Sequence, residues 1–145
     1  MAAGERVAMT KNIGLGFIAL FGFGALANAD DVTGVDRMLC AAGQVQICIE
    51  NDTCYSAAAV ELGIPDFVII DTDEKTVSTT PASGENRSTE FAAYSREAGL
   101  IYLQGIEGER VFSFVIDELT GRMTVAVARD GITVNVFGAC TDADL

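Results

Sequence analysis

The sequence contains no histidine and no tryptophan, and it has only nine basic side chains against 21 acidic ones. Without histidine, serine–histidine and cysteine–histidine catalysis and histidine-containing zinc sites are excluded. The formal net charge of -12 argues against nucleic-acid binding, because that function requires a basic surface. We therefore expect a non-enzymatic protein with no catalytic residue, no metal ligand and no cofactor.

Long apolar runs are also scarce. Only residues 13–26 form one, and they are too few to span a bilayer, which takes about 20 residues. Arg6 and Lys11 precede the run, and an Ala-Asn-Ala sequence at residues 27–29 follows it. This order is typical of a secretory signal peptide. We predict that residues 1–29 are a cleaved signal; a retained membrane anchor is the alternative.

Cleavage would leave residues 30–145 as a single, strongly acidic domain in which Lys75 is the only lysine. Such a chain repels nucleic acid and anionic surfaces and attracts basic proteins, at an association rate that falls as salt is added. We therefore expect a basic protein partner, no nucleic-acid partner and no membrane insertion after cleavage. Charge that serves only solubility is the alternative.

The cysteines are few but even in number, and all of them follow the predicted signal. They are Cys40, Cys48, Cys54 and Cys140. In an exported chain such cysteines form disulfides, and their spacing matches neither a zinc site nor a Cys-x-x-Cys motif. A hairpin of residues 45–49 and 53–55 would place Cys48 opposite Cys54, which suits a disulfide. Cys40 would then pair with Cys140. The predicted disulfides indicate a protein of the periplasm or a secreted protein.

Turn signals divide the second half of the chain into short β-rich segments. Glu107-Gly108 and Asp130-Gly131 predict two-residue hairpin turns, and residues 118–121 predict a four-residue loop. The second half therefore reads as a meander of four antiparallel strands.

The turn positions also fix which residues face each other in this meander. They pair Leu103 with Phe112, Phe114 with Val125, and Val125 with Val136. All three registers place the same apolar set on one face of the sheet. The set is Ile101, Leu103, Phe112, Phe114, Ile116, Met123, Val125, Val127, Val134 and Val136. We predict that this face is buried and that the other face is mainly solvated.

The first half gives weaker signals. Residues 67–71 and 76–80 predict two strands, and residues 80–87 predict a loop. Residues 55–63 and 88–98 fit either a strand or a helix; we favour strands, because turn signals recur at the spacing of an all-β protein. The predicted fold is all-β: a small, disulfide-bonded antiparallel meander of about seven or eight strands that closes into a barrel or sandwich.

One acidic cluster resembles a metal site. Residues 71–74 (Asp-Thr-Asp-Glu) are similar to the start of a calcium loop. The glycine and the downstream glutamate of such a loop are missing at the required spacing. A solvated turn is therefore the expected structure.

The second half resembles a group of small exported proteobacterial proteins to which no activity is assigned. The resemblance lies in Leu103-Gln104-Gly105, Phe112-Ser113, Ile116-Asp117, Thr120-Gly121-Arg122-Met123, Asp130-Gly131 and Phe137-Gly138-Ala139-Cys140-Thr141. The expected architecture is also similar to periplasmic barrels that inhibit lysozyme, whose recognition loop carries a Ser-Gly pair followed closely by tyrosine. Here Ser83-Gly84 is followed by Glu85, and the next tyrosine is Tyr94. That similarity implies partner binding by these four residues.

Together these features predict an exported periplasmic binding protein that acts through an acidic surface. Inhibition of a basic partner such as lysozyme is one concrete form. Two alternatives remain: a lipocalin-like carrier of a small apolar ligand, and an accessory subunit of a membrane-bound complex tethered by an uncleaved N-terminal helix. Tyr55, Phe91, Tyr94 and Tyr102 would line a cavity in the carrier, or fill the barrel otherwise.

Overall fold

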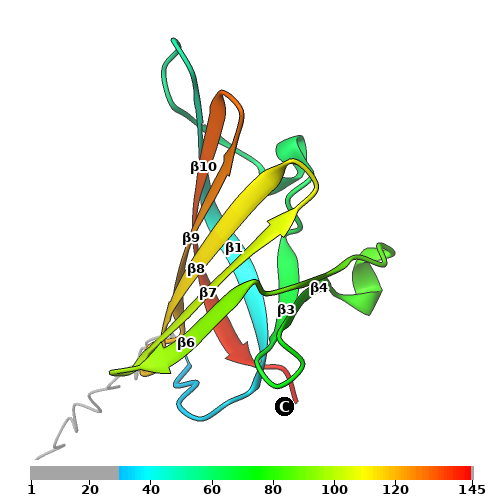
Figure 1. Ribbon diagram of the computed structural model, residues 1–145, viewed down its shortest axis with the longest axis vertical. Coiled ribbons are helices and arrows are strands. Elements are labelled where there is room, and N and C mark those ends of the chain that lie inside the picture. The colour runs from blue at the N-terminus through cyan, green and yellow to red at the C-terminus, as the bar shows by residue number, and fades with distance from the viewer. Residues whose placement is uncertain (1–29, 145) are drawn as a thin grey trace, which may run out of the picture.

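The computed structural model describes residues 30–144, so the predicted signal peptide lies outside the described residues. The described chain is all-β, with ten strands and two short 3-10 helices (Figure 1). The strands are β1 (Arg37–Ile49), β2 (Tyr55–Ala57), β3 (Phe67–Asp71), β4 (Thr76–Thr79), β5 (Ser88–Glu90), β6 (Ala93–Glu97), β7 (Leu100–Glu107), β8 (Arg110–Asp117), β9 (Arg122–Arg129) and β10 (Ile132–Asp142). The helices are η1 (Ala59–Leu62) and η2 (Pro81–Ser83).

All ten strands belong to one antiparallel sheet. Its order is β5-β4-β3-β1-β10-β9-β8-β7-β6, and β2 pairs with β1 beside this path. The sheet curls as a partly open barrel, and the chain passes directly from one edge strand to the other at Phe91 and Ala92 (Figure 1). The Phe91 amide donates to the Lys75 carbonyl and the Ala92 amide donates to the Gln104 carbonyl, each at 2.8 Å. This corner joins the two edges.

The predicted barrel-like all-β fold is confirmed, with more strands than expected. Residues 55–63 form β2 followed by η1 rather than one strand, because Gly63, at φ 63°, ends a tight turn of helix there. Residues 88–98 form β5 and β6, which are separated at the corner described above. These short elements account for the larger number.

The meander is confirmed, with one register corrected. Val125 pairs with Phe114 and with Val136, as the turns predicted. Leu103, however, pairs with Phe114 rather than with Phe112. The first turn consists of Gly108 and Glu109, since glycine at φ 60° suits the first central position of a hairpin turn. A shift of two residues keeps every side chain on its predicted face.

The predicted apolar face forms the core. Nine of its ten members are buried, and Val127 is half-buried against them. Val32, Met38, Ile47 and Ile70 from the first half complete the interior. Because η1 contributes the buried Ala59, this helix closes one end of the curled sheet.

The N-terminal segment of the described chain closes the other end. Val32 is fully buried, and its amide donates to the Glu118 carbonyl at 2.7 Å. Arg96 on β6 donates to the Val35 carbonyl at 2.6 Å and to the Asp36 carboxylate at 3.2 Å. The arginine therefore ties this segment to an edge of the sheet.

Both predicted disulfides are present. Cys40 is bonded to Cys140, its direct partner in the β1–β10 register, and Cys48 is bonded to Cys54 at the β1–β2 hairpin. Disulfides persist in oxidising compartments, so these bonds indicate an extracytoplasmic protein. In the described part of the chain, no helix has the length and apolar character needed to cross a membrane.

Candidate functional site

A groove of about 410 Å³ lies between residues 60–67, which run from η1 to the start of β3, and the loop that contains η2. Its walls carry Val60, Ile64, Pro65 and Phe67 from the first segment and Ala82 from the second. Val60 is 70% exposed and Phe67 is 51% exposed, so large apolar side chains face solvent here. Single exposed apolar residues are ordinary on a protein surface, whereas several in one hollow suggest a binding site.

Short-range contacts shape both walls. The Ile64 amide donates to the Ala59 carbonyl at 3.1 Å, which turns the chain after η1 toward β3. In the opposite wall, Gly84 at φ 72° ends η2. The Ser83 hydroxyl donates a hydrogen bond to the Thr80 carbonyl at 2.7 Å and accepts one from the Glu85 amide at 3.1 Å. Ser83 therefore fixes the loop that carries Glu85.

The charged residues that line the groove are acidic. They are Asp66 and Glu85, which are both exposed, and no lysine or arginine is among the described lining residues. Arg87 approaches one Glu85 oxygen only to 3.5 Å. The groove therefore combines apolar walls with a negative rim.

A second hollow, of about 90 Å³, adjoins the groove. Ile64 and Pro65 line both spaces and separate them. The smaller hollow reaches the barrel interior, where Phe112, Phe114 and Val125 line it. It is an apolar cavity beneath a charged entrance.

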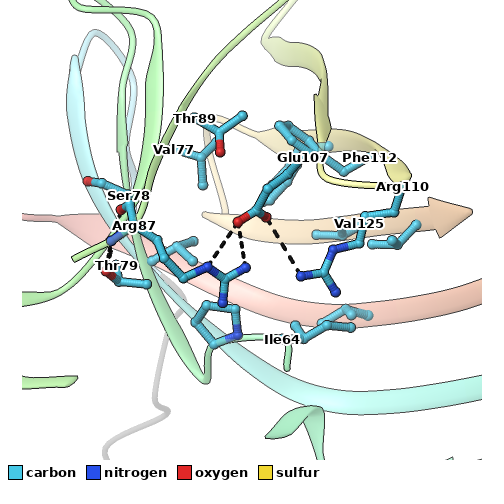
Figure 2. A pocket seen from close by; sticks show the side chains of 15 residues that line it. Ile64, Val77, Ser78, Thr79, Arg87, Thr89, Glu107, Arg110, Phe112 and Val125 are labelled. Carbon is cyan, nitrogen blue, oxygen red and sulfur yellow. Dashed lines mark hydrogen bonds and ion pairs between the residues drawn. The ribbon is translucent and has the colours of Figure 1, made fainter. Parts of the chain in front are cut away.

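Glu107 lies between two arginines at this entrance (Figure 2). Arg87 donates to Glu107 Oε1 through Nε at 2.9 Å and through a terminal nitrogen at 2.6 Å. A terminal nitrogen of Arg110 lies 3.8 Å from Glu107 Oε2. The hydrogen bonds from Arg87 to Glu107 are the main reason that the pKa of the Arg87 guanidinium lies above its ordinary value.

The same arginines hold η1 in place. Arg87 donates to the Gly63 carbonyl and Arg110 donates to the Leu62 carbonyl, each at 3.0 Å. The last carbonyls of a helix have no partner within it, and arginine side chains often satisfy them. The cluster thus connects the β4–β5 loop, the β7–β8 hairpin and the helix at this end of the barrel.

The structure brings together only part of the predicted partner-binding set. Ser83 and Glu85 line the groove, and Gly84 is exposed in the same loop. Tyr94 lies on β6, where its half-buried ring packs beside Phe91 with centroids 6.4 Å apart. Tyr94 is not among the residues that line the groove.

Sequence reasoning missed the other wall of the groove. Val60 and Phe67 belong to the predicted strands 55–63 and 67–71, and Asp66 lies between these strands, so the sequence gives no sign that the three side chains line one site. Their proximity to Glu85 depends on how β3 and β4 pair in the sheet.

No group of three or more potential metal-ligating residues occurs in residues 30–144. The acidic segment 71–74 forms the β3–β4 turn, in which the Glu74 amide donates to the Asp71 carboxylate at 2.9 Å. The Asp71 carboxylate therefore accepts a hydrogen bond within the turn.

Comparison with other proteins gives no family assignment: the chain has no significant match among protein-family models, curated proteins or solved structures.

Proposed function

We propose that this protein is an exported, non-enzymatic binding protein that holds a basic protein partner in the groove between η1 and η2. The observation that carries the proposal is the presence of exposed Val60 and Phe67 beside Asp66 and Glu85 in one hollow. Lysine and arginine have an apolar stem and a charged head. The stem would pack on the two apolar side chains while a carboxylate binds the head.

The charge of the whole molecule supports the same kind of partner. The strong excess of acidic side chains accelerates encounter with a basic protein and makes the association rate fall with ionic strength. Two disulfides fit the periplasm or the exterior, where lysozyme is a basic enzyme that such a protein would meet. Inhibition of lysozyme is the concrete form that we propose to test first.

The first experiment titrates the purified exported protein into a lysozyme assay and measures binding by calorimetry at low and high salt. We expect lysis to fall at stoichiometric excess and affinity to fall as salt is added. Undiminished lysis together with no heat of binding would remove lysozyme as the partner.

Variants test the groove itself. We expect D66N to weaken binding about threefold and F67S about tenfold, because each removes one part of the recognition of a basic side chain. The matched control is D73N, which removes the same charge from the exposed β3–β4 turn at the other end of the barrel. Equal losses in D66N and D73N would mean that only overall charge matters and that the groove is not the site.

The cavity beneath Glu107 favours a second candidate, the binding of a small apolar ligand. Its volume of about 90 Å³ is below the roughly 300–1,000 Å³ of ordinary ligand pockets, so only a very small molecule would fit. Native mass spectrometry of protein purified from cells tests this candidate. A bound apolar mass would support it, and an unliganded mass would count against it.

A further inference from the structure

The middle of the outward-facing side of strands β7 to β10 carries no charge. We define the uncharged face as the outward-pointing residues in the middle of these four strands. They are Tyr102, Gln104, Ile106, Val111, Ser113, Val115, Thr124, Ala126, Ala128, Thr133, Asn135 and Phe137. No aspartate, glutamate, lysine or arginine occupies any of these positions. In a chain with 21 acidic and nine basic residues, charge is thus confined to the ends of this part of the sheet.

Exposed apolar side chains gather on this face. Tyr102 pairs with Val115, and Ile106 pairs with Val111, across β7 and β8. Phe137 joins the first of these rows through its pairing with Thr124. All five apolar residues are between 37% and 65% exposed, and they are half of the large apolar residues exposed in the described chain.

We propose that the uncharged face binds the same face of a second copy of this chain. Both copies are strongly acidic, so they repel wherever their acidic ends approach. The uncharged face is the surface on which this repulsion is smallest and on which burial of Val115 and Phe137 is favourable. A basic partner gains no ion pair there, whereas a second copy presents a matching surface related by a two-fold axis.

Face-to-face packing of sheets gives this contact a known geometry. Sheets pack about 10 Å apart, with strand directions aligned or orthogonal. Uncharged Gln46 on β1 and Ser95 on β6 flank the uncharged face, so a contact that includes them extends over six strands. Strands about 4.8 Å apart and about 17 Å long then give roughly 500 Å² per copy. That area is at the lower limit of specific interfaces, and the curl of the sheet reduces it further, so the dimer is weak.

The salt dependence of this dimer is opposite to that of the proposed partner binding. Salt screens the repulsion between two acidic copies, so it strengthens self-association. The same salt weakens attraction to a basic protein. One measurement at two ionic strengths therefore distinguishes the two interactions.

Sedimentation velocity of the full exported protein, over a wide range of concentration at low and high salt, tests the proposal. We expect a monomer–dimer equilibrium that shifts toward dimer as salt is added. A monomer under all conditions, a dimer that dissociates as salt is added, or open-ended growth beyond the dimer would each overturn the proposal.

Substitutions at the centre of the face locate the contact. Ala126 is exposed in the middle row, so A126E and A126K both place a charge there without removing a core side chain. We expect both to weaken dimerisation about tenfold. V115E is a second test in the neighbouring row. The matched control is L119E, since Leu119 is 71% exposed in the β8–β9 loop and lies outside the face.

The pattern among these variants decides the outcome. Loss of dimer in A126E and A126K with a normal dimer in L119E supports burial of the face. Loss in L119E equal to that in A126E would show that added negative charge alone is responsible. A dimer strengthened by A126K would show that the face meets an acidic surface instead. D66N and F67S should leave dimerisation unchanged, so failure of the groove proposal remains separate.

Discussion

At the scale of single residues, Gly138 has the least room of the glycines in the sheet. A methyl group added there would overlap the Ala41 backbone carbonyl and would lie 2.9 Å from the Met123 side chain. Ala41 cannot retreat, because β1 is paired with β10 on one side and with β3 on the other. The glycine therefore lets β1 and β10 approach closely next to the irregularity at Gly43.

We predict that G138A lowers the free energy of unfolding by about 3 kcal/mol through this overlap. Urea denaturation of the oxidised protein measures the loss. The matched control is G43A, where the added methyl group would meet the Phe137 carbonyl at 3.2 Å and needs only a small adjustment. Neither glycine has a positive φ, so backbone preference does not separate them. Similar losses in both variants would contradict the explanation.

At the scale of elements, Glu107 connects parts of the barrel that backbone hydrogen bonds do not join. In the described sheet, β5 and β6 are the two edges, and β5 has no ladder with β7. We call the boundary between β5 and β7 the seam, and the Arg87–Glu107 pair crosses it. Both side chains are 31% exposed. A pair that is partly buried and hydrogen-bonded contributes more to stability than a fully exposed pair does.

We predict that E107Q lowers the free energy of unfolding by about 1 kcal/mol and loosens the seam locally. Amide exchange should become faster in η1 and β5 and stay unchanged in β9 and β10, which are paired on both sides. E109Q is the matched control, because Glu109 lies in the same turn and makes no ion pair in the described chain. Uniform acceleration across the sheet would contradict a local role.

The elements also show what the sequence could predict. The faces of β7 to β10 follow from alternation alone, because burying one side of a sheet fixes the side of every residue. The predicted pairing of Leu103 was wrong because Gly108 can form a two-residue turn with either Glu107 or Glu109. Both turns leave every side chain on the same face of the sheet. Residues 55–63 were harder, since a single turn of 3-10 helix depends on what Ala59 meets in the core.

The groove was less predictable than the fold. A loop with Ser83 and Glu85 is visible in the sequence, whereas its opposite wall depends on non-local pairing of β3 with β1 and β4. The resemblance to lysozyme-inhibiting barrels added Tyr94 to that site, and the fold places it on another strand, outside the groove lining. Nothing in the local sequence distinguishes an exposed Phe67 from one in the core.

At the scale of the whole molecule, the charge is unevenly placed. Acidic side chains gather near both ends of the barrel, such as Glu50 and Asp130 at one end and Asp73 and Asp144 at the other. The face of β7 to β10 between these ends is uncharged. The proposed binding of a basic partner at one end and the proposed dimer contact along the side therefore use different surfaces and would not compete.

The two disulfides constrain this molecule on different scales, and their removal should reveal it. Cys48 and Cys54 are six positions apart, whereas Cys40 and Cys140 are 100 apart. In the chain-entropy model a longer closed loop removes more freedom from the unfolded state, which gives about 2 kcal/mol for the first bond and about 4.7 kcal/mol for the second. Cys40 and Cys140 are also buried in the core, so their loss removes packing as well.

We therefore predict that replacing Cys40 and Cys140 with alanine lowers the free energy of unfolding at least twice as much as replacing Cys48 and Cys54. Urea denaturation of both double variants measures the difference, and equal losses would mean that local strand pairing, rather than the link between β1 and β10, determines stability.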